Sequence, residues 1–206
     1  MAVVATITDR GHTGRGECVP YSHYGESVEG VAAAIDACAP AVARGLSRAE
    51  LAVLLPAGAA RNALDCALWD LEAKRSGKSA ASLAGVSALR PVLTAFTLSL
   101  AAPVAMAEAA CKARGHPLLK LKLGGPGDAA RLCAVRAAVP NARLIADANE
   151  AWQPHETESL LAIAADVSVE LIEQPLRAGK DALLAEIEHP VPVCADESAH
   201  DHASLD

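Results

Sequence analysis

Three short apolar runs in this chain end in a carboxylate, and they follow one another at nearly equal intervals. Their acids are Asp147, Glu173 and Asp196, which are 26 and 23 residues apart. A fourth run ends in Lys122, 25 residues before Asp147. Such an interval fits one strand, one helix and their loops, and successive parallel strands bring their carboxyl ends to one rim. We therefore expect these charged groups to converge there.

Carboxylate oxygens are the hard ligands that Mg²⁺ prefers, and three of them leave positions for water and for a bidentate substrate carboxylate. Each acid alone is more typical of a helix N-cap or a loop, but three at matched strand ends favour a metal site. Asn149 shares a strand face with Asp147 and is expected to orient the site. Glu197 points away from Asp196 if the strand continues, so we assign it a supporting role.

Two lysines lie on the strand that precedes the acids. Alternation sends Leu119, Leu121 and Leu123 to one face and Lys120 and Lys122 to the other. Two lysines alone are typical of a solvated edge strand, but a strand within a βα series normally has both faces covered. Crowding two cations in a partly desolvated site lowers the pKa of each, which predicts an amine base near neutral pH.

An amine base beside Mg²⁺ suits one demanding reaction. Removing a proton from the carbon next to a carboxylate places two negative charges on oxygen, and a metal bound to those oxygens stabilises the resulting enediolate. The residues therefore predict lysine-mediated proton abstraction from a carboxylate-bearing small molecule.

The second half of the chain has the element order needed to position these groups. Strands alternate with four helices, which predicts a parallel sheet with right-handed crossovers. We interpret residues 91–206 as the first five strands of a TIM-type (β/α)₈ barrel, because a complete barrel typically takes about 250 residues. The predicted strands cover residues 92–100, 118–123, 143–147, 169–173 and 191–196.

The first half differs in texture, and we interpret residues 1–90 as an incomplete α+β capping domain. An apolar, β-branched stretch predicts a strand over residues 2–7, and the glycines of residues 11–16 predict a turn. Helices are expected over residues 27–44 and 56–76.

Composition narrows the partners. The net charge of −7 and pI near 5.5 disfavour nucleic acid, so a small-molecule substrate is expected. No apolar run is long enough to span a bilayer, and the N-terminus lacks a secretory pattern, so we expect no membrane association and a cytoplasmic location. The six cysteines show no C-x-x-C spacing and are expected to be reduced and buried. The run Gly124-Gly125-Pro126-Gly127 matches no phosphate-binding motif and predicts a strand-to-helix turn.

These motifs together resemble the mandelate racemase and muconate-lactonising branch of the enolase superfamily. The resemblance rests on Lys120-Leu121-Lys122, Asp147-Ala148-Asn149, Glu173-Gln174-Pro175 and Asp196-Glu197-Ser198. Within that branch the chain looks most like the L-Ala-D/L-Glu dipeptide epimerases, on Gly16 to Tyr21, Tyr24-Gly25-Glu26 and Thr94 to Leu98.

The resemblance implies that Lys122 is the acid/base on one face of the substrate and that Lys120 tunes it. It implies Mg²⁺ on the three acids and substrate contacts from Thr97 and from Tyr24 in a cap loop. For Thr97, a plain β-branched strand residue is an equally good interpretation.

The chain also departs from the family pattern. Family members begin with an earlier strand and a mobile loop, carry an opposing lysine on the sixth barrel strand, and in dipeptide epimerases carry an acidic pair on the eighth. We expect this chain to be truncated at both ends and to lack these features. Purified alone, it is expected to bind Mg²⁺ weakly and to show no epimerase turnover.

Other interpretations stay open. The same lysines and metal would serve muconate cycloisomerisation, N-acylamino acid racemisation or a dehydration. Alternatively, the chain is a catalytically silent fragment whose open sheet edge would need another chain to cover it. A homo-oligomer is compatible with the sequence.

Overall fold

The computed structural model describes residues 1–86, 88–201 and 204. Some of the last residues of the predicted partial barrel, residues 91–206, therefore lie outside the described residues. The chain divides into two compact units, Met1–Arg90 and Pro91–Asp206. Each unit has its own buried core. They are therefore described one at a time.

The first unit is an antiparallel hairpin packed against a long helix. Strands β1 (Val3–Asp9) and β2 (His12–Cys18) pair along their whole length, and α4 (Ala59–Ser76) packs against them. Apolar residues from β1, β2 and four helices form the core. The remaining elements are η1 (Ser22–Tyr24), α1 (Val28–Ala37), α2 (Ala39–Ala43), α3 (Arg48–Leu54) and α5 (Ala80–Leu83).

The turn predicted over residues 11–16 is wrong beyond Gly11, because most of that segment belongs to β2. Gly14 and Gly16 lie against the backbone of α4: a Cβ would be 2.2 Å from the Ala67 carbonyl oxygen at Gly14 and 2.0 Å from the Ala63 carbonyl oxygen at Gly16. These glycines therefore permit a close approach of strand and helix. Such a requirement cannot be distinguished from a turn in the sequence.

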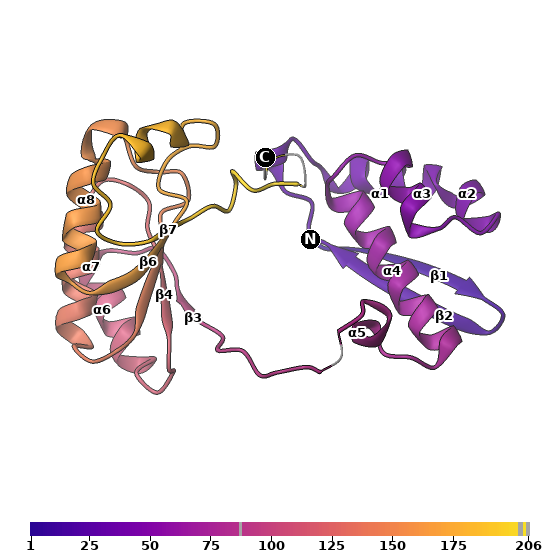
Figure 1. The fold of residues 1–206 in the computed structure, drawn as a ribbon, viewed down its shortest axis with the longest axis horizontal. Coiled ribbons are helices and arrows are strands. Elements are labelled where there is room, and N and C mark those ends of the chain that lie inside the picture. The colour runs from indigo at the N-terminus through magenta and orange to yellow at the C-terminus, as the bar shows by residue number, and fades with distance from the viewer. Residues whose placement is uncertain (87, 202–203, 205–206) are drawn as a thin grey trace. The chain divides into compact units, whose positions relative to one another are not determined.

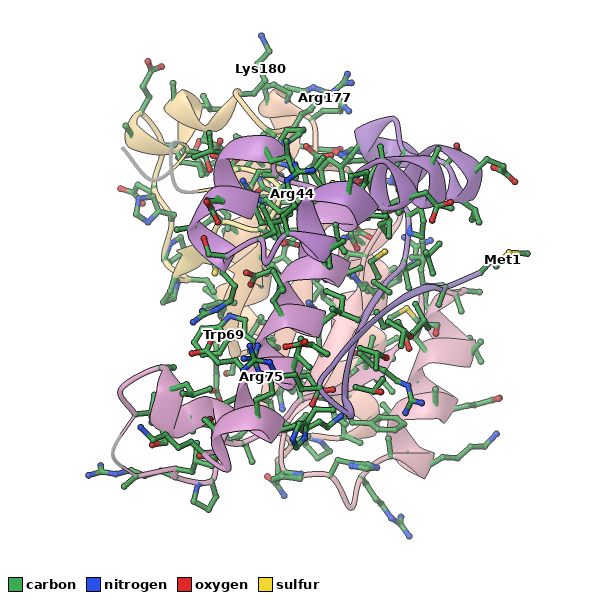
Figure 2. All side chains as sticks on the ribbon, turned by 90° about the vertical axis from the view of Figure 1, so that its right-hand side faces the viewer. Met1, Arg44, Trp69, Arg75, Arg177 and Lys180 are labelled. Atoms are coloured by element: carbon green, nitrogen blue, oxygen red, sulfur yellow. The ribbon has the colours of Figure 1, made fainter. Side chains whose placement is uncertain are left out.

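The helices of the first unit also differ from the prediction. The helix expected over residues 27–44 is two helices, with Cys38 between them. Helix α3 was not expected, although Ser47 and Glu50 form a capping box at its start. Figure 2 labels Trp69 and Arg75 on α4, and the guanidinium of Arg48 lies 3.4 Å from the Trp69 ring centroid.

The second unit is a five-stranded parallel sheet in the order β3-β4-β5-β6-β7. Helices α6, α7 and α8 lie side by side along one face (Figure 1). The α/β class and the partial barrel architecture are confirmed. The strands are β3 (Phe96–Leu98), β4 (Leu119–Lys122), β5 (Leu144–Asp147), β6 (Val169–Glu173) and β7 (Val193–Cys194), and the helices are α6 (Pro103–Lys112), α7 (Asp128–Ala138), α8 (Pro154–Asp166) and η2 (Asp181–Ala185).

Three predicted elements of this unit are clearly shorter or different, and the last predicted strand, residues 191–196, is limited to β7 (Val193–Cys194). The strand expected over residues 92–100 is limited to β3, and the fourth expected helix is the 3₁₀ segment η2. Among the described residues, no helix combines the length and apolarity needed to cross a bilayer.

Candidate functional site

The alternation of β4 places its lysines opposite its leucines. Leu119, Leu121 and Leu123 are buried in the core that the helices cover, whereas Lys120 and Lys122 are partly exposed on the other face. Because all neighbouring strands are parallel, residues paired in register share a face. The lysine face of β4 therefore continues across the sheet.

The register brings the predicted groups into one row at the carboxyl ends of the strands. Lys122 pairs with Asp147 on β5, and Asp147 pairs with Glu173 on β6. An irregularity between Leu144 and Ala146 shifts the pairing of β5 with β6 just before this row. The shift puts the last residue of β5 beside the last residue of β6, so both acids end their strands on the lysine face.

The three acids converge as expected. One carboxylate oxygen from each of Asp147, Glu173 and Asp196 lies within 4.8 Å of the other two. Asp147 is fully buried, Glu173 is partly buried and Asp196 is exposed. The cluster therefore opens to solvent on the side of Asp196.

Both lysines bind these carboxylates directly. The Lys120 Nζ is 2.9 Å from Asp147 Oδ2 and 2.6 Å from Glu173 Oε2. The Lys122 Nζ lies 2.6 Å from the same Asp147 Oδ2 and donates to Asn149 Oδ1 at 3.1 Å. The other Asp147 oxygen accepts the Asn149 backbone N–H at 3.0 Å. Asn149 thus holds both Lys122 and Asp147.

The pKa of Lys120 shifts in the direction opposite to the one expected. Burial acts to lower the pKa of Lys120, but hydrogen bonds to Glu173 and Asp147 outweigh it and raise that pKa above its ordinary value. The lowering of the pKa predicted from lysine crowding is therefore wrong for Lys120, because the groups nearest to its ammonium are carboxylates.

The pKa values of Asp147 and Glu173 shift in opposite directions. Burial alone would raise the pKa of Asp147, but hydrogen bonds from Lys122 and Lys120 bring it below its usual value. Burial raises the pKa of Glu173, the hydrogen bond from Lys120 opposes this, and the charges of Asp147 and Asp196 add to the increase. Three carboxylates here exceed two ammonium groups by one negative charge.

Backbone strain gathers at the same strand ends. Asn149, Glu150 and Gln174 have positive φ angles of 47°, 63° and 36°, although none is glycine. Such conformations cost of the order of 1–3 kcal/mol each and persist where the surroundings impose them. Here the Glu150 N–H donates to the Gln174 carbonyl oxygen at 2.8 Å, so the segments after β5 and β6 are joined.

The cluster fits a divalent cation. Ligand atoms about 2.1 Å from an octahedral Mg²⁺ lie about 3 to 4.2 Å apart, and the three carboxylate oxygens are already within 4.8 Å of one another. These separations are close to those of such a coordination shell. The excess negative charge would be reversed by the ion, leaving a positive site that suits a substrate carboxylate.

The other predicted site residues lie in different places. Thr97 is exposed on β3 and pairs in register with Lys120, so it shares the lysine face. Tyr24 lies in η1 of the first unit, in edge contact with the rings of Tyr21 and His23. Glu197 is partly buried, and its Oε2 is buried without a hydrogen-bond partner among the described residues.

Sequence reasoning assigned no role to Gln174, which lies next to the site in the motif Glu173-Gln174-Pro175. The Gln174 side chain is 1% exposed and makes several hydrogen bonds to the segment after β7. A glutamine directly after a strand-terminal acid was the available signal. Burial of its amide could not be inferred without the fold.

The cysteines only partly match the prediction. All six are free thiols, as expected. Cys18 and Cys38 are buried, but Cys66, Cys111, Cys133 and Cys194 are exposed, so the expectation of burial is wrong for these four. Small residues on Ala-rich helices do not reveal which helix face points inward.

Comparison with known protein families gives two matches that together cover most of the chain. Residues 1–85 match the mandelate racemase / muconate lactonizing enzyme N-terminal domain, and residues 102–206 match the enolase C-terminal domain-like family.

Individual proteins are similar over almost the whole chain. The L-Ala-D/L-Glu epimerase of Escherichia coli K12 is 46% identical over 98% of this chain and 64% of its own length. A crystal structure of an enolase family member from Agrobacterium tumefaciens with homology to dipeptide epimerases, with bound sodium and L-Ala-L-Glu, is 56% identical with a TM-score of 0.95, covering 99% of this chain and 63% of that one. A dipeptide epimerase from Enterococcus faecalis, complexed with Mg and L-Leu-L-Tyr, is 29% identical with a TM-score of 0.88, covering 98% and 62%. The chain thus spans a little under two thirds of these relatives.

Proposed function

The chain belongs to the mandelate racemase/muconate lactonizing enzyme family of the enolase superfamily, and we propose that it carries the metal site and one catalytic base of a Mg²⁺-dependent dipeptide epimerase. The observation that carries this proposal is the row Lys122, Asp147 and Glu173 in register, with Asp196 closing the acid cluster. Similarity to dipeptide epimerases supports the substrate class.

Asp147, Glu173 and Asp196 would hold the cation. Bound Mg²⁺ would supply the positive charge that stabilises the enediolate formed when a proton leaves the carbon beside a carboxylate. The substrate in this proposal is a short peptide such as L-Ala-L-Glu, whose C-terminal residue is inverted at its α-carbon.

The two lysines have different surroundings, which supports different roles. Lys122 is the last residue of β4 and its side chain is 34% exposed, so it is placed to meet the α-proton of a substrate. Lys120 lies two residues earlier on β4, its side chain is more buried, and its ammonium contacts two acids. We assign Lys122 as the base and Lys120 as the neighbouring charge that tunes it.

Thr97 and Tyr24 complete the proposal as substrate contacts, with Asn149 and Glu197 in supporting roles. Thr97 is supported by sharing the face of Lys120. Asn149 is supported by its hydrogen bonds with Lys122 and Asp147. A cytoplasmic location goes with the proposal and is compatible with six free cysteines.

The test is exchange of the substrate α-proton in deuterated water. Because both lysines lie on one strand, they reach one face of the α-carbon. With Mg²⁺, the chain is expected to exchange the α-proton of the C-terminal residue in one of L-Ala-L-Glu and L-Ala-D-Glu, followed by proton NMR, without inversion by these lysines alone.

Matched variants decide whether the proposed base is responsible. Lys122→Met should abolish the exchange, whereas Lys112→Met, at the exposed end of α6, should not change it. Absence of Mg²⁺-dependent exchange from both epimers, or exchange that survives Lys122→Met, would contradict the proposal. Faster exchange of N-acetylglutamate than of either dipeptide would favour an N-acylamino acid racemase instead.

A further inference from the structure

Asp196 lies where the β-sheet no longer holds the chain. Strand β7 covers only Val193–Cys194, and Asp196 follows it in an exposed segment. Ladder hydrogen bonds therefore cannot set the direction of its carboxylate. Asp147 and Glu173, in contrast, are the last residues of their strands and are held by the pairing of β5 with β6.

The side chain of Gln174 takes over where the ladder stops. Its Oε1 accepts the Asp196 backbone N–H at 2.9 Å and the Ser198 backbone N–H at 3.0 Å. An amide oxygen has two lone pairs, and both are used on this one segment. The backbone on either side of Glu197 is thus fixed to a single atom.

The other end of the amide is fixed as well. The Gln174 Nε2 donates to the Leu176 carbonyl oxygen at 2.8 Å, to Ser198 Oγ at 2.9 Å and to Asp181 Oδ1 at 3.2 Å. The Ser198 hydroxyl donates in turn to Asp181 Oδ2 at 2.5 Å. These partners leave the amide no alternative orientation, and they tie it to η2.

Burial and backbone geometry make the amide rigid. Gln174 is 1% exposed, and its backbone N–H donates to the Cys194 carbonyl oxygen at 2.8 Å. In the turn that follows, Arg177 and Lys180 point outward (Figure 2), whereas Asp181 accepts a hydrogen bond from the Gln174 amide. A buried polar group with all its partners satisfied specifies one arrangement.

We propose that Gln174 is a positioning residue that holds the Asp196 carboxylate against Asp147 and Glu173. Because Gln174 directly follows Glu173, the residue links the second and third acids of the cluster. This inference rests on the proposed metal site. It adds to that site the group that orders its one exposed ligand.

The variant that tests it is Gln174→Met, which keeps an unbranched side chain and removes both amide functions. The matched control is Ser198→Ala, which loses the Ser198 hydroxyl contacts but keeps both backbone N–H bonds to Gln174 Oε1. Asp196→Asn serves as the reference for a damaged ligand. Each variant is titrated with Mg²⁺ by calorimetry, and amide hydrogen exchange is followed by NMR.

Gln174→Met is expected to weaken Mg²⁺ binding about tenfold to a hundredfold, as loss of groups that orient metal ligands usually does. The Asp196 and Ser198 amides should exchange at least about tenfold faster than in the wild type. Ser198→Ala should keep Mg²⁺ affinity within about threefold of the wild type and keep the Asp196 amide protected.

Equal loss of Mg²⁺ affinity in Gln174→Met and Ser198→Ala would overturn the inference, as would an unchanged Asp196 amide in Gln174→Met. If Gln174→Met does not fold, the wild type itself still tests the inference: its Asp196 and Ser198 amides should exchange at least about tenfold more slowly than unprotected amides, and exchange at the unprotected rate overturns the inference. Failure of the wild type to bind Mg²⁺ would instead contradict the proposed function, while amide exchange would still test the positioning.

Discussion

Among the described residues of the second unit, the two buried aspartates both form ion pairs with cationic side chains, but their surroundings are very different. Asp128, at the start of α7, accepts the Gly124 N–H at 3.1 Å, the Gly125 N–H at 2.7 Å and the Trp152 indole N–H at 2.9 Å. Its charge is balanced by Arg131, whose Nη1 lies 2.7 Å away. One carboxylate thus pairs with one guanidinium. The predicted strand-to-helix turn that begins at Gly124 is confirmed, because this segment joins β4 to α7.

Asp147 is equally buried, but its surroundings are not balanced. Two ammonium groups, Lys120 and Lys122, share its single Oδ2. A second and a third carboxylate, Glu173 and Asp196, lie beside it. The surplus of negative charge and the opening to solvent distinguish this cluster from the closed arrangement at Asp128.

Burial and ion pairing therefore do not by themselves indicate a functional site. Both aspartates have these features, but only Asp147 has convergent acids that a cation would bring together. The arrangement at Asp128 stabilises the fold, and the one at Asp147 is open to a ligand. This difference can be measured.

The largest expected effect is on stability at Asp128. Asp128→Ala would leave the Arg131 guanidinium without its carboxylate partner and would remove the acceptor of two backbone N–H groups and the Trp152 indole. Breaking a buried pair in this way costs about 3–5 kcal/mol. The free energy of unfolding from urea titration measures this loss. The control Asp166→Ala, at the exposed end of α8, should stay within about 0.5 kcal/mol of the wild type, and a similar loss in both variants would remove the distinction.

The second prediction concerns metal affinity at Asp147. Asp147→Asn keeps the shape of the side chain but removes a ligand charge, and Mg²⁺ binding should weaken about a hundredfold, or about 2.8 kcal/mol. Calorimetric titration measures the change. Asp166→Asn should bind like the wild type, and an unaltered affinity in Asp147→Asn would remove the acid cluster from consideration as a metal site.

The third prediction concerns the effect of the Lys120 ammonium on Mg²⁺ affinity. Lys120 lies on two of the candidate ligands and opposes a bound cation, so Lys120→Met should bind Mg²⁺ about tenfold more tightly. The matched variant Arg131→Met should destabilise the fold without changing Mg²⁺ affinity. Weaker Mg²⁺ binding in Lys120→Met would mean that the lysine orders the acids more than it repels the ion.

The smallest effect is the pH dependence of Glu173. Since its pKa in the folded chain is raised, its contribution to stability is full below the unfolded pKa of about 4.3 and is lost as the pH rises through the folded value. Glu173→Gln stays uncharged, so without a divalent ion its stability relative to the wild type should rise between about pH 4 and 7. Urea unfolding across this pH range measures the free energy of unfolding of Glu173→Gln relative to the wild type. If this relative stability falls as the pH rises, the hydrogen bond from Lys120 affects the pKa of Glu173 more than burial does.

Much of the second unit could be predicted because its pattern is local. Alternating leucines and lysines on β4 require opposite faces whatever surrounds them, and acids at the ends of successive strands must meet when the strands are parallel. The first unit was harder to predict. The glycines of β2 reflect contact with α4, about fifty residues further along the chain, and the sequence of the strand contains no sign of that contact.

The site shows the same division at finer scale. By itself, the sequence determined which residues carry charge, on which strand face they lie and that three acids gather at one rim, because side-chain alternation and strand spacing follow from covalent geometry. Only the tertiary structure decided that two lysines share one oxygen of Asp147, that the pKa of Lys120 is raised and that a buried Gln174 holds the segment of Asp196. Those features depend on distances of about 3 Å between segments far apart in the chain, which packing of the whole unit sets.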